Sequence, residues 1–133
     1  MKQELFFTRE PIDETAWRST DNCDREIGAV LTFLGIVRGT ENEGPIRGIE
    51  YEAFEAMARH QFELIFAKMA EKWPLDGVKV VHRLGAVPAG EPSLWVEVIA
   101  RHRQEAFAAG LYLVDEMKRV VPIWKRPLPA RGN

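Results

Sequence analysis

The chain has 133 residues, of which 46% are hydrophobic and 29% charged, and its formal net charge is −2. This length fits one domain with one core, and the composition argues against a disordered chain. No apolar run approaches the roughly 20 residues that a membrane span needs, and the first residues lack the apolar stretch of a signal peptide. The single cysteine, Cys23, can form no internal disulfide. We therefore expect one cytoplasmic domain over residues 1–133, with a flexible tail at residues 127–133.

Charge is distributed unevenly along the chain. Residues 101–126 hold six basic side chains against three acidic ones, so this segment carries +3 and the remainder carries −5. A nucleic-acid-binding protein usually carries a basic excess over a whole face. A short basic segment in an acidic chain instead favours a small anionic ligand.

The first third of the chain is predicted to contain short elements and polar loops. Residues 4–8 indicate a strand, and Pro11 is expected to open a short helix that runs to Ser19. A polar loop follows at residues 21–26. Residues 27–38 are β-rich and apolar on both faces, which predicts a central strand. Residues 39–45 contain Gly, Asn and Pro and are expected to form a loop.

The remainder alternates strands with two long helices. Residues 46–54 alternate as a strand does, and a core-facing helix follows until Pro74 stops it. Its apolar stripe comprises Phe54, Met57, Ala58, Phe62, Ile65, Phe66, Met69 and Trp73. Residues 78–84 and 94–100 are predicted strands joined by residues 85–90. The last helix, residues 104–120, has a stripe of Phe107, Leu111, Val114, Met117 and Val121, and Pro122 ends it. The order predicts an α+β fold with a mainly antiparallel sheet.

Lys118 and Lys125 are candidate catalytic residues on either side of the Pro122 break. Lys118 lies in the last turn of the final helix, where a cation also complements the helix dipole, so a purely structural role is an alternative. Pro122 to Trp124 form a rigid apolar turn that can hold Lys125 against a pocket wall. A lysine partly removed from water can act as acid, base or acyl acceptor.

His102 and Arg103 are candidate anion ligands at the start of the same helix. A helix N-terminus attracts anions, although a surface-exposed basic run is an equal alternative. Fifteen residues separate Arg103 from Lys118, which is roughly 22 Å of helix at 1.5 Å per residue. One small ligand cannot reach both ends within one chain. Either there are two sites, or a symmetric dimer brings the ends of two helices together, and we favour the dimer.

Other site types find little support in the sequence. Arg38, at the end of the predicted central strand, can bind a phosphate or form a surface ion pair. There is no glycine-rich phosphate loop, and three scattered histidines with one cysteine have no metal-ligand spacing. His82 and Arg83 lie on a predicted strand, and we expect them to have a structural role.

These residues together resemble the large, catalytic subunit of molybdopterin synthase. The similarity covers roughly residues 4–126, and no single stretch would suffice without the others. The matching stretches are Gly28–Arg38, Ile49–Phe54, Trp73–Leu75, His82–Gly85, Ala100–Arg103 with Ala106 and Phe107, and Lys118 with Pro122–Lys125. The sequence departs from the family pattern at Pro127, where the family usually has Glu, and in its short C-terminal end.

The resemblance implies an α/β hammerhead fold with an added antiparallel sheet. It implies an enzyme that converts cyclic pyranopterin monophosphate into molybdopterin, with no metal or organic cofactor. The sulfur would come from a small ubiquitin-like carrier with a C-terminal thiocarboxylate, and two large subunits would form the core of a heterotetramer. Lys118 would polarise the acyl group of the carrier, and Lys125 would hold substrate or transfer protons. Arg38, Phe33 and the partner's pair of residues 102 and 103 would bind the pterin phosphate.

Two alternatives remain at this point. A non-catalytic module that binds nucleotides or RNA would also use a basic segment, although the acidic remainder of the chain disfavours it. A scaffold that has kept the fold and lost the activity is the third possibility.

Overall fold

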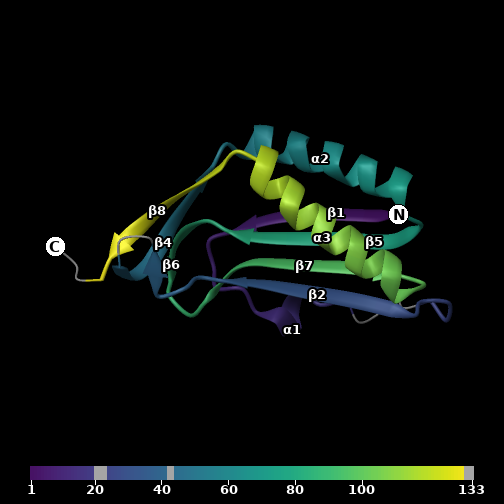
Figure 1. Ribbon diagram of the computed structural model, residues 1–133, viewed down its shortest axis with the longest axis horizontal. Coiled ribbons are helices and arrows are strands. Elements are labelled where there is room, and N and C mark those ends of the chain that lie inside the picture. Colours follow the sequence, from purple (N-terminus) through teal and green to yellow (C-terminus); the bar gives the residue numbers. More distant parts are fainter. Residues whose placement is uncertain (20–23, 42–43, 131–133) are drawn as a thin grey trace.

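The structure, a computed structural model, describes residues 1–19, 24–41 and 44–130 (Figure 1). Within this part of the chain it contains two β-sheets and three helices, so the predicted α+β class is confirmed. Cys23 and half of the predicted loop at residues 21–26 lie outside the described residues. The elements in chain order are β1 (Lys2–Thr8), α1 (Glu14–Trp17), β2 (Ala29–Ile36), β3 (Thr40–Glu41), β4 (Gly44–Ala53), α2 (Glu55–Lys72), β5 (Leu75–Arg83), β6 (Gly85–Pro88), β7 (Pro92–Ala100), α3 (Arg103–Val120) and β8 (Ile123–Pro129).

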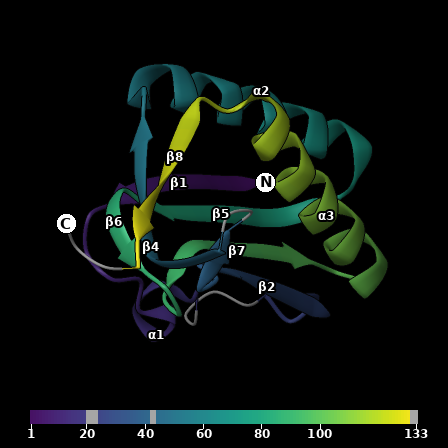
Figure 2. The same cartoon turned by 60° about the vertical axis from the view of Figure 1, so that its left-hand side comes forward.

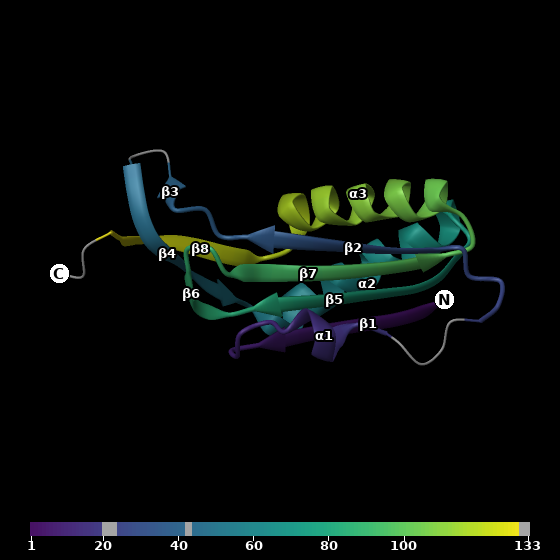
Figure 3. The same ribbon diagram turned by 90° about the horizontal axis from the view of Figure 1, so that it is seen from below.

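The first sheet has the strand order β1-β5-β7-β2. β1 pairs with β5 in parallel, and the other two pairings are antiparallel. α2 and α3 cover one face, whereas α1 lies on the other (Figures 1 and 3). The prediction that residues 27–38 form a central strand is wrong, because β2 is an edge strand. It is apolar on both faces because Leu31 packs under α3 and Leu34 joins a cluster with Trp95 on the opposite face.

The second sheet extends from one end of the first (Figure 2). β4 lies between β6 and β8 and pairs antiparallel with both, while the short β3 pairs with the start of β4. The predicted alternation of residues 46–54 is confirmed. Ile49 of β4 is buried in a small second core, together with Val87 of β6 and Val37, the residue that follows β2.

Three segments predicted as connections or tail are in fact strands. Residues 40–41 and 44–45 form the β3–β4 hairpin, and residues 85–88 form β6. Residues 127–129 belong to β8 rather than to a flexible tail. Pro127 and Pro129 disfavour a central strand, but β8 pairs only with β4, and prolines are tolerated on such an edge.

The first turns of α2 and the first half of α3 do not bury the large apolar residues that were predicted to face the core. The middle of α2 is buried as expected, through Phe62, Ile65, Phe66 and Met69. By contrast, Phe54 and Met57 are 60% and 56% exposed, and Phe107 and Leu111 of α3 are 62% and 66% exposed. α3 presents small residues to the sheet instead, namely Ala106, Ala109 and Gly110, which let the helix approach β2 and β7 closely. The prediction followed large apolar side chains, whereas close helix–sheet contact requires small ones.

α1 is shorter than predicted and begins at Glu14 rather than at Pro11. The side chain of Asp13 accepts a hydrogen bond of 3.0 Å from the backbone N–H of Thr15, so Asp13 is the residue that caps the helix. Among the described residues, neither long helix is apolar enough to cross a membrane.

Candidate functional site

A cavity of about 410 Å³ opens where the C-terminal end of α3 meets the end of β2 and the second sheet. Its walls combine apolar side chains with a small set of polar groups. The polar and charged side chains that line it are Arg38, Glu41, Tyr51, His82, Ser93, Lys118 and Lys125. A concave site with a few convergent polar groups is the usual form of a small-molecule site.

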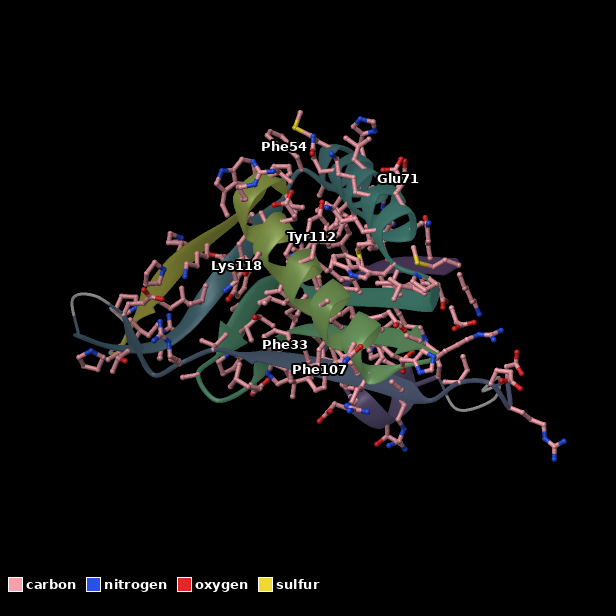
Figure 4. All side chains as sticks on the ribbon, turned by 45° about the vertical axis from the view of Figure 1, so that its right-hand side comes forward. Phe33, Phe54, Glu71, Phe107, Tyr112 and Lys118 are labelled. Atoms are coloured by element: carbon pink, nitrogen blue, oxygen red, sulfur yellow. The ribbon has the colours of Figure 1, made fainter. Side chains whose placement is uncertain are left out.

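Lys118 reaches the cavity from the last turn of α3. Its neighbour Met117 is buried, which fixes this turn against the sheet, whereas the side chain of Lys118 itself is exposed. Figure 4 shows Lys118 between the end of α3 and the second sheet. The helix dipole places partial negative charge at this end, which favours an ammonium group there.

Lys125 enters the same cavity from β8, on the other side of the Pro122 break. β8 runs antiparallel to β4 and places Lys125 opposite Tyr51 in the register. The Nζ atom of Lys125 lies 3.6 Å from Oε1 of Glu41. The side chain of Lys125 is 59% exposed and that of Glu41 21% exposed, so this partly solvated ion pair orients the ammonium group and contributes little to stability.

Phe33 and Arg38 complete the group of predicted residues that the cavity brings together. Phe33 lies in β2 and is 41% exposed. Arg38 follows β2 at a point where the buried Val37 anchors the chain, since the Val37 N–H donates to Glu91 O and the Val37 carbonyl accepts from Gly90 N–H. The backbone beside Arg38 is therefore held while its guanidinium is exposed.

His102 and Arg103 do not reach this cavity. Arg103 is the first residue of α3, and His102 occupies the N-cap position without a side-chain capping bond. The helix spans 18 residues, so these two residues and Lys118 lie at opposite ends of it. The prediction that one chain cannot bring all of these residues to one ligand agrees with this geometry.

The sequence reasoning missed the cavity roles of Tyr51, Ser93, Glu41 and especially His82. The side chain of His82 is buried, and burial lowers its pKa below the ordinary value. Val78, Val80 and His82 lie on the same face of β5. The two valines pack into the main core, and His82, the last of the three, lines the cavity. The signal that could have identified His82 is its place in the strand: a polar residue occupies the position where the alternation predicts another buried apolar side chain.

The basic residues of the last third do not form one continuous basic face in the described structure. Arg119 pairs with Glu116 at 2.8 Å, and Arg126 pairs with Glu50. These pairs neutralise the segment locally and leave Lys118 and Lys125 directed at a cavity. The arrangement suits a small anion and disfavours a long polyanion.

Comparison with known proteins identifies the family. A family model described as MoaE protein matches residues 7–120. The chain is 38% identical to curated relatives called molybdopterin synthase catalytic subunit from Brucella melitensis and Bacillus subtilis. Each alignment covers 82% of this chain, and the chain spans about two thirds of the two relatives, 66% and 69% of their lengths.

A solved structure agrees with this assignment. The crystal structure of molybdopterin synthase from Staphylococcus aureus superposes with a TM-score of 0.85 at 31% identity, covering 95% of this chain and 91% of that one. The resemblance seen in the sequence is therefore confirmed. The chain belongs to the MoaE protein family.

Proposed function

We propose that this chain is the catalytic subunit of a molybdopterin synthase. It transfers sulfur from a thiocarboxylated carrier to cyclic pyranopterin monophosphate and so forms the dithiolene of molybdopterin. The observation that carries the proposal is the convergence of Lys118 and Lys125, from α3 and β8, on one cavity that also holds Arg38. The names of the relatives support the same activity.

The two lysines have separate roles in this proposal. The ammonium group of Lys118 lies against the acyl group of the incoming thiocarboxylate and stabilises the negative charge that develops on its oxygen. Lys125, held by Glu41, binds the substrate or transfers protons. Phe33 forms an apolar wall, and Arg38 binds the substrate phosphate.

His102 and Arg103 bind the same substrate from a second protomer. The exposed apolar residues of α3, Phe107 and Leu111, support a homodimer. Phe107 lies near Phe33 of the neighbouring edge strand (Figure 4). A two-fold axis near the middle of α3 would bring the start of one helix toward the end of the other. Each pocket then contains Lys118 and Lys125 of one protomer and residues 102 and 103 of its neighbour.

The sulfur carrier is a small ubiquitin-like subunit whose C-terminal tail enters the cavity. One carrier at each pocket of the dimer gives a heterotetramer. We place this assembly in the cytoplasm, where the lone cysteine of the sequence and a thiocarboxylate both persist in reduced form.

The test is reconstituted turnover with the variant Lys118→Ala. With thiocarboxylated carrier and pterin precursor, we expect the variant to lose molybdopterin formation by at least 10²-fold, the usual cost of removing one charge-stabilising donor. The fold should be kept, because the side chain is exposed at a helix end. Lys68→Ala, which removes an exposed lysine from α2, is the matched control and should retain full turnover.

Full activity of Lys118→Ala would overturn the role of this lysine. A wild-type chain that forms no molybdopterin, but binds RNA with a steep salt dependence, would overturn the proposed function itself.

A further inference from the structure

His82 is a buried polar residue that the roles proposed above leave unused. It is only 4% exposed, yet it lines the cavity that contains both lysines. Its neighbours on the same face of β5, Val78 and Val80, belong to the apolar core. An imidazole at this position is costly to bury, so a specific arrangement must support it.

The hydrogen bond of His82 fixes which ring nitrogen is free. Nδ1 lies 2.8 Å from the backbone carbonyl oxygen of Arg83. A carbonyl oxygen only accepts, so Nδ1 must donate, and in the neutral ring the lone pair is then on Nε2. No hydrogen bond to Nε2 is found among the described residues. The ring of Tyr51 packs edge-on against the imidazole, with 5.1 Å between the two ring centroids. The hydrogen bond therefore orients the imidazole, and in the neutral ring Nε2 is a proton acceptor without a partner among the described residues.

Charged groups share the cavity with His82, whereas its neighbours within the sheet are uncharged. Among the described residues, the charged groups that share the cavity with it are the cations Arg38, Lys118 and Lys125 and the carboxylate Glu41. Its register partners on the neighbouring strands, Phe7 of β1 and Leu94 of β7, are uncharged. Burial lowers the pKa of the imidazole, which favours the neutral ring, the form that has a free lone pair for a proton.

Sulfur transfer from a thiocarboxylate needs such an acceptor, and this step of the inference rests on the proposed function. Once the carrier sulfur has bonded to the pterin carbon, it is still bonded to the acyl carbon of the carrier. Release requires water to attack that carbon. A carbon–oxygen bond forms, the acyl carbon–sulfur bond breaks with its electron pair remaining on sulfur, and the water must give up a proton.

We propose that Nε2 of His82 is the general base that takes this proton from the attacking water. The products are a carrier carboxylic acid, which loses the second proton of the water to solvent, and a pterin thiolate. The imidazolium then returns its own proton to the thiolate or to solvent. Lys118 stabilises the oxyanion of the same step, so the two residues act on opposite charges. His82 thus serves release of the carrier and not formation of the first carbon–sulfur bond.

The experiment uses His82→Asn in single turnover with thiocarboxylated carrier and pterin precursor. The Asn amide can still donate to the Arg83 carbonyl, but it cannot act as a base. We expect the first bond to form at close to the wild-type rate, while carrier release slows about 10²- to 10⁴-fold. Intact-mass spectrometry should then detect a carrier that has gained the mass of the pterin. His60→Asn, an exposed position on α2, is the matched control and should release carrier as the wild type does.

If the wild-type chain turns over, the proposed function stands, and two results would then overturn the role of His82 without affecting it. One is release by His82→Asn at the wild-type rate, and the other is equal slowing of both steps with no accumulated adduct. A wild-type chain that transfers no sulfur would overturn the proposed function and this inference together. Should the variant fail to fold, the wild-type pH profile decides. The rate of carrier release must then fall with a one-proton slope as the pH falls through a pKa below 6.5. A release rate that does not change with pH would overturn the role of His82.

Discussion

Gly48 lies in β4 so close to β6 that no side chain fits at this position. A Cβ atom placed there would be 2.5 Å from the carbonyl oxygen of Val87 and 3.1 Å from Cα of Pro88, and both are backbone atoms that cannot move aside cheaply. We expect Gly48→Ala to lower the free energy of unfolding by about 1–3 kcal/mol, the usual cost of overpacking. Urea unfolding should show a lower midpoint with an unchanged slope.

Gly39→Ala is the matched control for this prediction, because a Cβ atom at Gly39 meets no atom within 4 Å. Its stability should stay within about 0.5 kcal/mol of the wild type. Equal midpoints for the two variants would contradict the close approach of β4 and β6.

The buried imidazole of His82 should also make stability depend on pH. Burial lowers its pKa in the folded chain below the ordinary value of 6.5, which applies to the unfolded chain. Just below pH 6.5 the unfolded state therefore binds more protons, so stability falls as the pH falls, and the loss is complete only below the folded-state pKa. Between about pH 7 and pH 5, urea unfolding should lose stability more steeply for the wild type than for His82→Asn. Parallel curves for the two proteins would show that this histidine is not the cause.

At the scale of elements, α3 begins with a residue that does not cap it. His102 has the extended backbone of an N-cap residue, but its side chain makes no capping hydrogen bond. We expect His102→Ser to raise the free energy of unfolding by about 0.5–1 kcal/mol through a new cap. Molybdopterin formation should fall, because the variant lacks the imidazole that we propose as an anion ligand. Thermal unfolding and turnover of the same preparation measure the two effects.

His102→Ala separates the two contributions. It removes the imidazole and introduces no cap, so turnover should fall as in the serine variant while stability stays near the wild-type value. Undiminished turnover in both variants would exclude His102 from the site.

At the scale of the whole molecule, a pocket shared between protomers predicts complementation. A mixed dimer of Lys118→Ala and Arg103→Ala chains contains one pocket with both substitutions and one with neither. Each variant alone should be inactive, whereas refolding them together should restore activity through the intact pocket. A mixture that stays inactive, although mass spectrometry shows that mixed dimers form, would mean that each pocket is built by one chain.

Local patterns in the sequence were sufficient for the two long helices and the strands of the first sheet, although they missed three strand segments of the second sheet. Apolar periodicity identified both long helices and the strands of the first sheet, because it reports which side of the chain axis is buried. The break at Pro122 correctly separated Lys118 from Lys125, and the length of α3 separated both from Arg103. These inferences depend only on residues that are near one another along the chain.

The tertiary structure decided the features that depend on contacts between distant residues. Position within a sheet is one, since β2 carries apolar residues on both faces and is nevertheless an edge strand. The pairing of β8 with β4 is another, because strands 70 and more residues apart share no local signal.

Which residues line the cavity was likewise a tertiary outcome. Arg38, Lys118 and Lys125 were chosen from their local settings and Phe33 from the family resemblance, and only folding places them together. His82 has the local pattern of a core residue on β5, and it becomes a cavity residue only because α3 ends above it. The sequence by itself determined the long helices, the strands of the first sheet and the chemical groups available, because these follow from local periodicity and residue type. The structure decided their convergence, because the distances between groups are set by packing across the whole chain.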